Sequence, residues 1–162
     1  MPVAFACRAP AGAVWNRYLA TRARQILRAL AVRSELSLSL VADPEMHELN
    51  RAHRGKNRPT DVLAFPLHDP PVAADVTSLG DVVISIDTAT LAAAEQRRPL
   101  AAILDDLLIH GILHLLGYDH EISPAEERRM ARKARALRTA IGPLAPPARA
   151  PAAPRRVTRA RA

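Results

Sequence analysis

The stretch His110-Gly-Ile-Leu-His114-Leu-Leu-Gly117-Tyr-Asp-His120 organises the rest of this 162-residue chain. Two histidines four residues apart project from one helix face, with Cβ atoms about 6 Å apart, and can reach one metal ion at about 2.0 Å. Gly117 is a typical helix stop, so the chain can turn there and bring His120 back toward the first two rings. Three neutral imidazoles without a fourth protein ligand describe an open metal site with room for a water molecule.

A protease motif and a plain core helix are the alternatives to such a metal site. The spacing H-x3-H-x2-G-x2-H also occurs in metzincin proteases, but these carry a glutamate general base directly after the first histidine. Here that position is Gly111, so the metal-binding spacing is kept while the peptidase base is missing. The stretch could also be a leucine-rich core helix with structural histidines. Three histidines at ligand spacing, with a glycine stop between the second and third, favour the metal site.

Length and composition predict one domain with a basic tail. A chain of 162 residues can bury a core without disulfides, and its single cysteine fits a reducing compartment. A secretory leader and an apolar run of about 18 residues are both missing, so we expect no membrane span and a cytoplasmic protein. The formal net charge is +7, yet residues 1–125 carry −2. The arginines after residue 142 can contact a polyanion, although plain solvation explains them slightly better.

Hydrophobic periodicity predicts the element order β-α-β-α-β-β-α-α-α. An α+β fold follows, in which a small mixed β-sheet packs against helices and the metal site lies in a cleft. Residues 1–142 are expected to form a single domain, and residues 143–162, rich in Pro, Ala and Arg, a disordered tail. Strands are expected at residues 2–7, 35–41 (half-buried), 62–65 (buried) and 79–86; helices at 14–32, 46–52, 88–96 (capped by Asp87), from Pro99 through the histidines, and from 124 to 141 (capped by Ser123).

A second constellation lies in the predicted loop of residues 51–59. Arg54 offers a planar fork that matches phosphate oxygens, and Lys56 adds a point charge beyond Gly55. A basic loop alone is usually only solvated, but beside a metal it suits a phosphodiester. Asp106, one turn before His110, either supports a metal ligand or simply faces solvent. Thr60-Asp61 and Gly80-Asp81 are weaker candidates for a pocket rim, and local backbone hydrogen bonding explains them better.

Three stretches of the chain resemble the YbeY family of bacterial metal-dependent endoribonucleases, also called rRNA maturation factors. Residues 110–120 match the family pattern H-G-x-L-H-L-x-G-Y-D-H at every specified position. Residues 54–66 follow R-G-K-D-x-P-T-D-V-L-S-F-P except at Asn57 and Ala64, and residues 79–84 are similar to L-G-D-[IV]-x-I. Many members carry a histidine where this chain has Asp106.

The resemblance implies that His110, His114 and His120 hold one Zn²⁺ per chain and that Arg54 is the functional arginine. It implies single-strand-specific cleavage of RNA in maturation of the 16S rRNA 3′ end and in quality control of the 70S ribosome. The expected partners are single-stranded RNA, the 16S rRNA precursor and the ribosome or its 30S subunit, without DNA or membrane. We expect residues 1–142 to be the endoribonuclease domain.

The corresponding reaction is metal-assisted hydrolysis of an RNA phosphodiester. A metal-bound water or a ribose 2′-OH attacks, with His114 in the catalytic site, while Arg54 and Lys56 bind the substrate and Arg54 stabilises phosphate charge. Two alternatives stay open at this point. One is a zinc metallopeptidase-like hydrolase, and the other is a non-catalytic ribosome-assembly factor with a structural metal.

Overall fold

The element order of the structure agrees with the predicted one. This computed structural model describes residues 3–54, 61–69, 72, 76–119 and 122–148, with only the backbone of residues 53 and 54. In chain order the elements are β1 (Val3–Cys7), the 3-10 helix η1 (Pro10–Trp15), α1 (Asn16–Ala29), β2 (Glu35–Val41), α2 (Asp43–Arg54), β3 (Val62–Pro66), β4 (Ser78–Ser85), α3 (Ile86–Gln96), α4 (Leu100–Leu115) and α5 (Pro124–Ile141).

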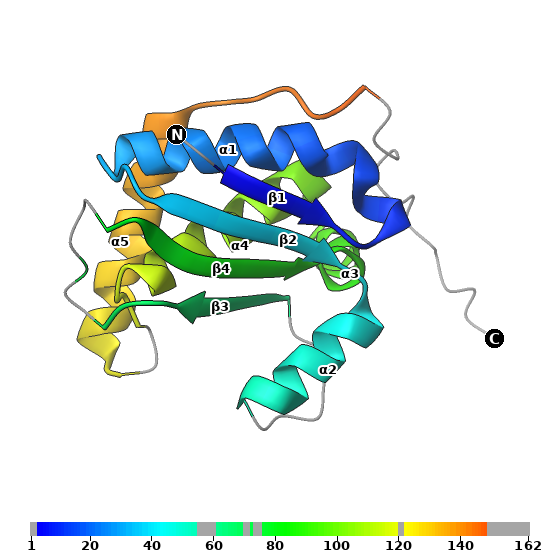
Figure 1. Cartoon of the computed structure of the whole chain (residues 1–162). Coiled ribbons are helices and arrows are strands. Elements are labelled where there is room, and N and C mark those ends of the chain that lie inside the picture. The colour runs from blue at the N-terminus through cyan, green and yellow to red at the C-terminus, as the bar shows by residue number, and fades with distance from the viewer. Residues whose placement is uncertain (1–2, 55–60, 70–71, 73–75, 120–121, 149–162) are drawn as a thin grey trace.

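The four strands form one mixed sheet in the order β1-β2-β4-β3, with β1, β2 and β4 parallel and β3 antiparallel to β4. Helices α1, α4 and α5 pack behind this sheet, and α2 lies at its lower edge (Figure 1). The α+β class and the small mixed sheet packed against helices are thereby confirmed. Among the described helices, none is both long and apolar enough to cross a membrane.

Strand β2 is buried more completely than its alternating sequence predicts. Leu36, Leu38 and Leu40 are fully buried in the main core, as expected. Ser39 is also buried, and Val41 packs with Met46 of α2 in a second cluster on the opposite side. The half-buried assignment is therefore wrong for the end of the strand, because α2 covers the face that was expected to be open.

Strand β3 is an edge strand, whereas its apolar sequence suggested a buried one. Only Leu63 of its residues is buried. The strand is fixed by its antiparallel pairing with β4, where Pro66 lies opposite Gly80. Gly80 has φ +130°, and a Cβ atom there would lie 2.2 Å from the carbonyl oxygen of Phe65. This close backbone approach explains why the position carries glycine.

The starts of α2 and α3 are joined by a small polar network, and this network changes the predicted cap. Ser85 is the N-cap of α3, because its hydroxyl accepts a hydrogen bond from the Thr88 amide. Ser85 Oγ and Thr88 Oγ1 both donate to Asp43, at 2.5 and 2.6 Å. Asp87, the predicted cap, instead accepts from the Asp43 amide. The predicted cap was wrong by two residues, because the hydrogen-bond partner of Asp87 lies on α2 and not on α3.

Helix α5 begins and ends where the sequence predicts. The Ser123 hydroxyl accepts from the Glu126 amide, and Pro124 occupies the first turn. Gly142, with φ +64°, follows the last helical residue. Of the predicted tail, the structure describes residues 143–148, where Leu144 lies partly buried against the core. The disordered-tail assignment for residues 149–162 stays a prediction, since they lie outside the described residues.

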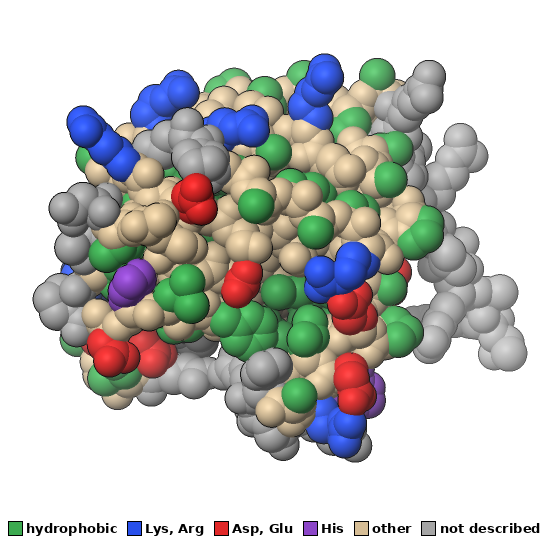
Figure 2. Space-filling model, in the orientation of Figure 1, with side chains coloured by type: hydrophobic (Ala, Val, Ile, Leu, Met, Phe, Trp, Pro, Cys, Tyr) green, Lys and Arg blue, Asp and Glu red, His purple; other side chains and the backbone are tan. Residues whose placement is uncertain are grey.

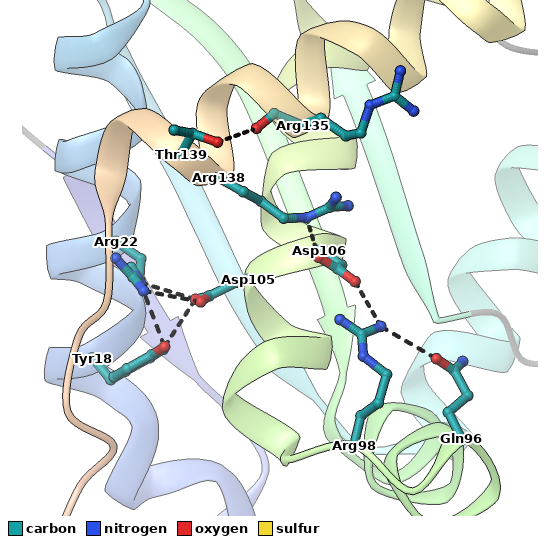
Figure 3. A network of polar contacts seen from close by, with 9 residues as sticks. All are labelled: Tyr18, Arg22, Gln96, Arg98, Asp105, Asp106, Arg135, Arg138 and Thr139. Carbon is teal, nitrogen blue, oxygen red and sulfur yellow. Dashed lines mark hydrogen bonds and ion pairs between the residues drawn. The ribbon is translucent and has the colours of Figure 1, made fainter.

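A buried ion pair ties α1 to α4 (Figure 3). The Arg22 guanidinium donates to both carboxylate oxygens of Asp105 at 3.1 Å, and its side chain is only 4% exposed. The Tyr18 hydroxyl also donates to Asp105, at 3.0 Å. Burial raises the pKa of Tyr18 to about 12. Sequence reasoning missed this cluster, although Arg22 stands among Tyr18, Leu19 and Ile26 on the apolar face of the helix.

We expect Tyr18 to give the fold a distinct alkaline sensitivity. In the unfolded chain its phenol ionises near pH 10, whereas the folded protein keeps the proton up to about pH 12. Between these values the folded state binds more protons, so the free energy of unfolding falls as pH rises, by about 2–3 kcal/mol. Urea unfolding across this window should show the fall, and Tyr18→Phe should remove it. The Tyr118→Phe control should retain the wild-type fall, and an equal flattening in both variants would contradict the assignment.

Candidate metal and RNA site

The first two histidines of the motif lie side by side on α4. The ring centroids of His110 and His114 are 4.6 Å apart, with their planes inclined at 68°. Both rings are half-buried, whereas Leu107, Leu108 and Ile109 before them are buried in the core. The helix therefore directs two imidazoles together toward a partly solvent-accessible region, which is the arrangement that two ligands of one metal ion need.

A Schellman motif ends α4 directly after the second histidine. Gly117 adopts φ +97°, its amide donates to the carbonyl of His114, and the Tyr118 amide donates to the carbonyl of Leu113. The guanidinium of Arg129 on α5 stacks over the Tyr118 ring, with its central carbon 4.5 Å from the centroid. The turn predicted at Gly117 is thus present, and it is stabilised both by backbone hydrogen bonds to the end of α4 and by the contact of Tyr118 with α5. His120, the third predicted ligand, lies outside the described residues.

Gly111 lets α4 approach the sheet closely. A Cβ atom at this position would lie 2.7 Å from Val82 Cγ1 on β4 and 3.3 Å from Val62 Cγ2 on β3. Position 111 therefore faces the sheet, and a glutamate there would be directed against Val82 and Val62. The missing peptidase base thus has a packing reason, which argues against the metallopeptidase alternative.

We expect Gly111→Ala to lower the free energy of unfolding by about 1–2 kcal/mol, because overpacking outweighs the better helix propensity of alanine. Val82→Ala supplies space for the added methyl group, so the double variant should be more stable than the two separate losses predict. Urea unfolding of the four proteins measures this coupling. Additive losses would show that the two positions do not meet as described.

Two adjacent acids anchor α4 on its other sides (Figure 3). Asp105 binds the buried Arg22 of α1. Asp106 contacts Arg98 at 2.8 Å and Arg138 of α5 at 2.6 Å. Simple exposure of Asp106 to solvent, one of the two interpretations of this residue, is wrong, because its carboxylate joins Arg98, which precedes α4, to Arg138 near the end of α5. These contacts hold the histidine-bearing helix in place between its neighbours.

The second constellation is only partly described. Arg54 is the last residue of α2, so the loop predicted at residues 51–59 begins later than expected. Lys56 and Thr60 lie outside the described residues. Asp61 serves the local backbone, since its carboxylate accepts from the Val62 amide and its carbonyl from the Ser85 amide. Within the described parts of the chain, no three His, Cys, Asp or Glu side chains are grouped to hold a metal ion, and His120 is not among these residues.

Comparison with known proteins places this architecture in a family. The family described as Endoribonuclease YbeY matches residues 12–142. The endoribonuclease YbeY of Anaeromyxobacter sp. (strain Fw109-5) is 50% identical over 143 residues, which cover 88% of this chain and 73% of that protein. The endoribonuclease YbeY of Halorhodospira halophila is 43% identical over 110 residues, covering 67% of this chain and 71% of the relative.

A solved structure shows the same fold. The solution structure of TM1509 from Thermotoga maritima superposes with a TM-score of 0.63 at 27% identity, over 86% of this chain and 88% of the other. The family match over residues 12–142 includes strands β2, β3 and β4, the helix with the paired histidines and the last helix, and it carries an endoribonuclease role with RNA as the substrate. From the match over residues 12–142 and a relative that is half identical across most of the chain, we conclude that this chain belongs to the YbeY endoribonuclease family.

Proposed function

We propose that this protein is a zinc-dependent, single-strand-specific endoribonuclease that acts in maturation of the 16S rRNA 3′ end and in quality control of the 70S ribosome. Family membership supports the nuclease activity. The observation that carries the metal dependence is the pair of half-buried imidazoles with centroids 4.6 Å apart on α4. The partners would be single-stranded RNA, the 16S rRNA precursor and the ribosome or its 30S subunit, all of them in the cytoplasm.

The residues present fit a zinc site of the catalytic type. His110 and His114 would hold the ion together with His120, which follows the Schellman turn by three residues. Neutral imidazoles suit Zn²⁺, and three of them without a carboxylate or thiolate are typical of a catalytic centre. When bound, the zinc supplies Lewis-acid activation of a water molecule and a phosphoryl oxygen.

The protein's own contribution is to bind and orient the phosphodiester. In this proposal the guanidinium of Arg54, from the end of α2, donates to two non-bridging phosphate oxygens and stabilises the charge that develops on them. Lys56 binds a neighbouring phosphate as a point charge. His114 is a rigidly positioned ligand in this proposal, because its helix packs closely on the sheet at Gly111 and is tied to neighbouring helices through Asp105 and Asp106.

The aromatic residues support recognition through the RNA backbone. Trp15 and Tyr18 are buried in the core, with 2% and 5% exposure, and cannot stack on bases. Phe65 and Tyr118 are only partly exposed. Since base stacking can contribute little, phosphate contacts should dominate, and binding should depend strongly on salt and weakly on sequence.

Arg54→Ala should test this assignment. We expect the rate of single-stranded RNA cleavage to fall by about a hundred-fold or more, as for loss of one preorganised charge-stabilising donor, while zinc content and melting temperature stay near wild type. Arg51→Ala, one turn earlier on the same helix, is the matched control and should retain wild-type cleavage. Cleavage is measured on one RNA sequence as a single strand and as a duplex. Equal rates in Arg54→Ala and wild type would remove Arg54 from the site, and efficient cleavage of the duplex would overturn single-strand specificity.

A further inference from the structure

Two neighbouring helices on the side of the molecule behind the sheet carry aligned, solvent-exposed arginines. On α1 the spacing is seven and then four residues, and on α5 it is four and then three, so each set occupies one line along its helix. On each helix this line lies opposite the buried face, which contains Leu19 and Ile26 on α1 and Met130 and Leu137 on α5. The six residues, together called the arginine stripe, are Arg17, Arg24 and Arg28 of α1 and Arg128, Arg132 and Arg135 of α5.

The guanidinium groups of the arginine stripe have no carboxylate partners within the described part of the chain. Helix α1 contains no Asp or Glu, and α5 has none after Glu127. By contrast, Arg8, Arg98 and Arg138 contact Glu45 or Asp106 within 2.8 Å. Figure 3 shows the difference on α5, where Arg138 turns toward Asp106 and Arg135 points away from it. Arginine is abundant throughout this chain, but these arginines elsewhere are paired with carboxylates, so abundance alone does not explain the arginine stripe.

The arginine stripe costs stability in the free protein. Arg24 and Arg28, and likewise Arg128 and Arg132, are like charges four residues apart on one helix, an arrangement that destabilises a helix by about 0.2–0.5 kcal/mol per pair. Helices α1 and α5 also pack against each other, so the two positive lines lie on neighbouring helices. Figure 2 shows Lys and Arg side chains gathered along the upper edge of the molecule, over α1. A bound polyanion would relieve this repulsion.

The chemistry of the surface favours a phosphate backbone over other polyanions. The exposed large hydrophobic residues of the described chain are Val14, Leu67, Leu91 and Ile122, and none belongs to α1 or α5. A protein interface would need an apolar or aromatic centre, and an amphipathic membrane helix would need a free apolar face. Here the apolar faces of both helices are buried in the core. Guanidinium groups spread over about 16 Å of α1 match a row of phosphates.

We propose that the arginine stripe is a second RNA-binding surface, which holds the phosphate backbone of the substrate beyond the segment that is cleaved. The inference rests on the proposed function, because it takes RNA as the ligand. Helix α5 starts only four residues after His120, and its Arg129 lies over Tyr118 of the motif. RNA that leaves the cleavage site can therefore continue onto α5 and from there onto α1.

The test compares two double variants that lose the same charge. Arg24→Gln/Arg28→Gln removes part of the arginine stripe, and Arg8→Gln/Arg51→Gln removes arginines that pair with carboxylates elsewhere. Fluorescence anisotropy, recorded before cleavage sets in, gives the affinity for a labelled RNA of about 30 nucleotides and for one of about 6 nucleotides, which fits a single binding site.

For the long RNA, the stripe variant should lose affinity about ten-fold, and the slope of log K against log salt should shrink by about 2. Its affinity for the short RNA, its cleavage of the short RNA and its melting temperature should stay at or slightly above wild type. The control variant should bind both RNAs within two-fold of wild type. Arg132→Gln/Arg135→Gln should repeat the stripe result from α5.

Several results would overturn the proposal without touching the proposed function. One is an equal loss of affinity in the control variant, which would show an effect of net charge alone. Another is unchanged binding of the long RNA by the stripe variant. A loss of binding to polyglutamate or to phosphatidylglycerol vesicles as large as the loss for RNA would point to a protein or membrane ligand instead. Absence of RNA cleavage in the wild-type protein would instead refute the proposed function.

Discussion

His114→Ala is expected to lower the rate of RNA cleavage by about a hundred- to a thousand-fold, the range seen when preorganised catalytic groups are removed. The variant keeps only one of the two paired imidazoles on α4, so zinc should be bound weakly or not at all. Because His114 is half-buried and at the end of its helix, little core packing is lost and the melting temperature should change by a few degrees at most. Cleavage assays, metal analysis and thermal melting together measure the three effects.

His68→Ala is the matched control, since His68 is exposed and its ring nitrogen contacts only the Ser78 carbonyl among the described atoms. It should cleave RNA at the wild-type rate. The two alternatives to the proposed function give different outcomes for His114→Ala. Unfolding of the variant would indicate a structural metal in a non-catalytic assembly factor. Robust peptide cleavage by the wild-type protein that disappears in the variant would indicate a metallopeptidase.

Arg22→Met should lower the free energy of unfolding by about 3–5 kcal/mol, because it leaves the Asp105 carboxylate buried without its countercharge. Burial raises the pKa of Asp105, while Arg22 opposes that rise. Without Arg22 the pKa rises further, so the folded state takes up a proton more readily than the unfolded state. The variant should therefore recover stability as the pH falls through this raised pKa, and its deficit should be largest near neutral pH.

Two further variants separate the buried pair from general effects of losing an arginine. Arg22→Met/Asp105→Leu removes both charges and should regain most of the lost stability. Arg24→Met changes an exposed arginine on the same helix and should stay within about 0.5 kcal/mol of wild type. Urea unfolding provides the measurement, and a loss in Arg22→Met no larger than that in Arg24→Met would contradict the role of the pair.

Local sequence patterns were enough to predict the element order and the fold class. Helix boundaries set by a single stretch of chain were also predictable, as at Ser123 and Gly142, because each of these residues and its hydrogen-bond partner lie within four residues of each other. The same holds for the turn after His114, where Gly117 and Tyr118 bond to the preceding helical carbonyls. In each case the contacts that stabilise the feature come from residues close in sequence.

Features that depend on distant residues were missed. Asp87 is of a residue type that often caps helices, but its carboxylate accepts a hydrogen bond from the backbone amide of Asp43 on another helix. Arg22 resembles the surface arginines around it until Asp105, 83 residues away, is placed beside it. Ser39 was assigned to an open face that α2 in fact covers. Periodicity along one element gives the direction of a side chain but not what that side chain meets.

The candidate site likewise has some features that local sequence predicts and others that depend on distant residues. The sequence spacing was enough to predict that His110 and His114 share a helix face, and it also suggested that the glycine between them excludes a peptidase base. It could not show why position 111 is glycine, because Val82 and Val62 belong to distant strands. Nor could it show that Asp106 is held by Arg98 and Arg138, residues on either side of α4 in the chain.

The position of β2 at the centre of the sheet has a consequence for how the protein folds. Its pairing with β4 joins Leu38 to Val82, residues that are 44 positions apart, and its buried leucines belong to the same core as the buried residues of α4, which ends at Leu115. While the chain is being synthesised, the apolar surface of the strand pair β1–β2 therefore stays exposed to solvent until the second half of the chain has left the ribosome. Contacts between such distant residues slow folding. We therefore expect the incomplete chain that consists of the N-terminal half to aggregate most readily and to depend most on chaperones.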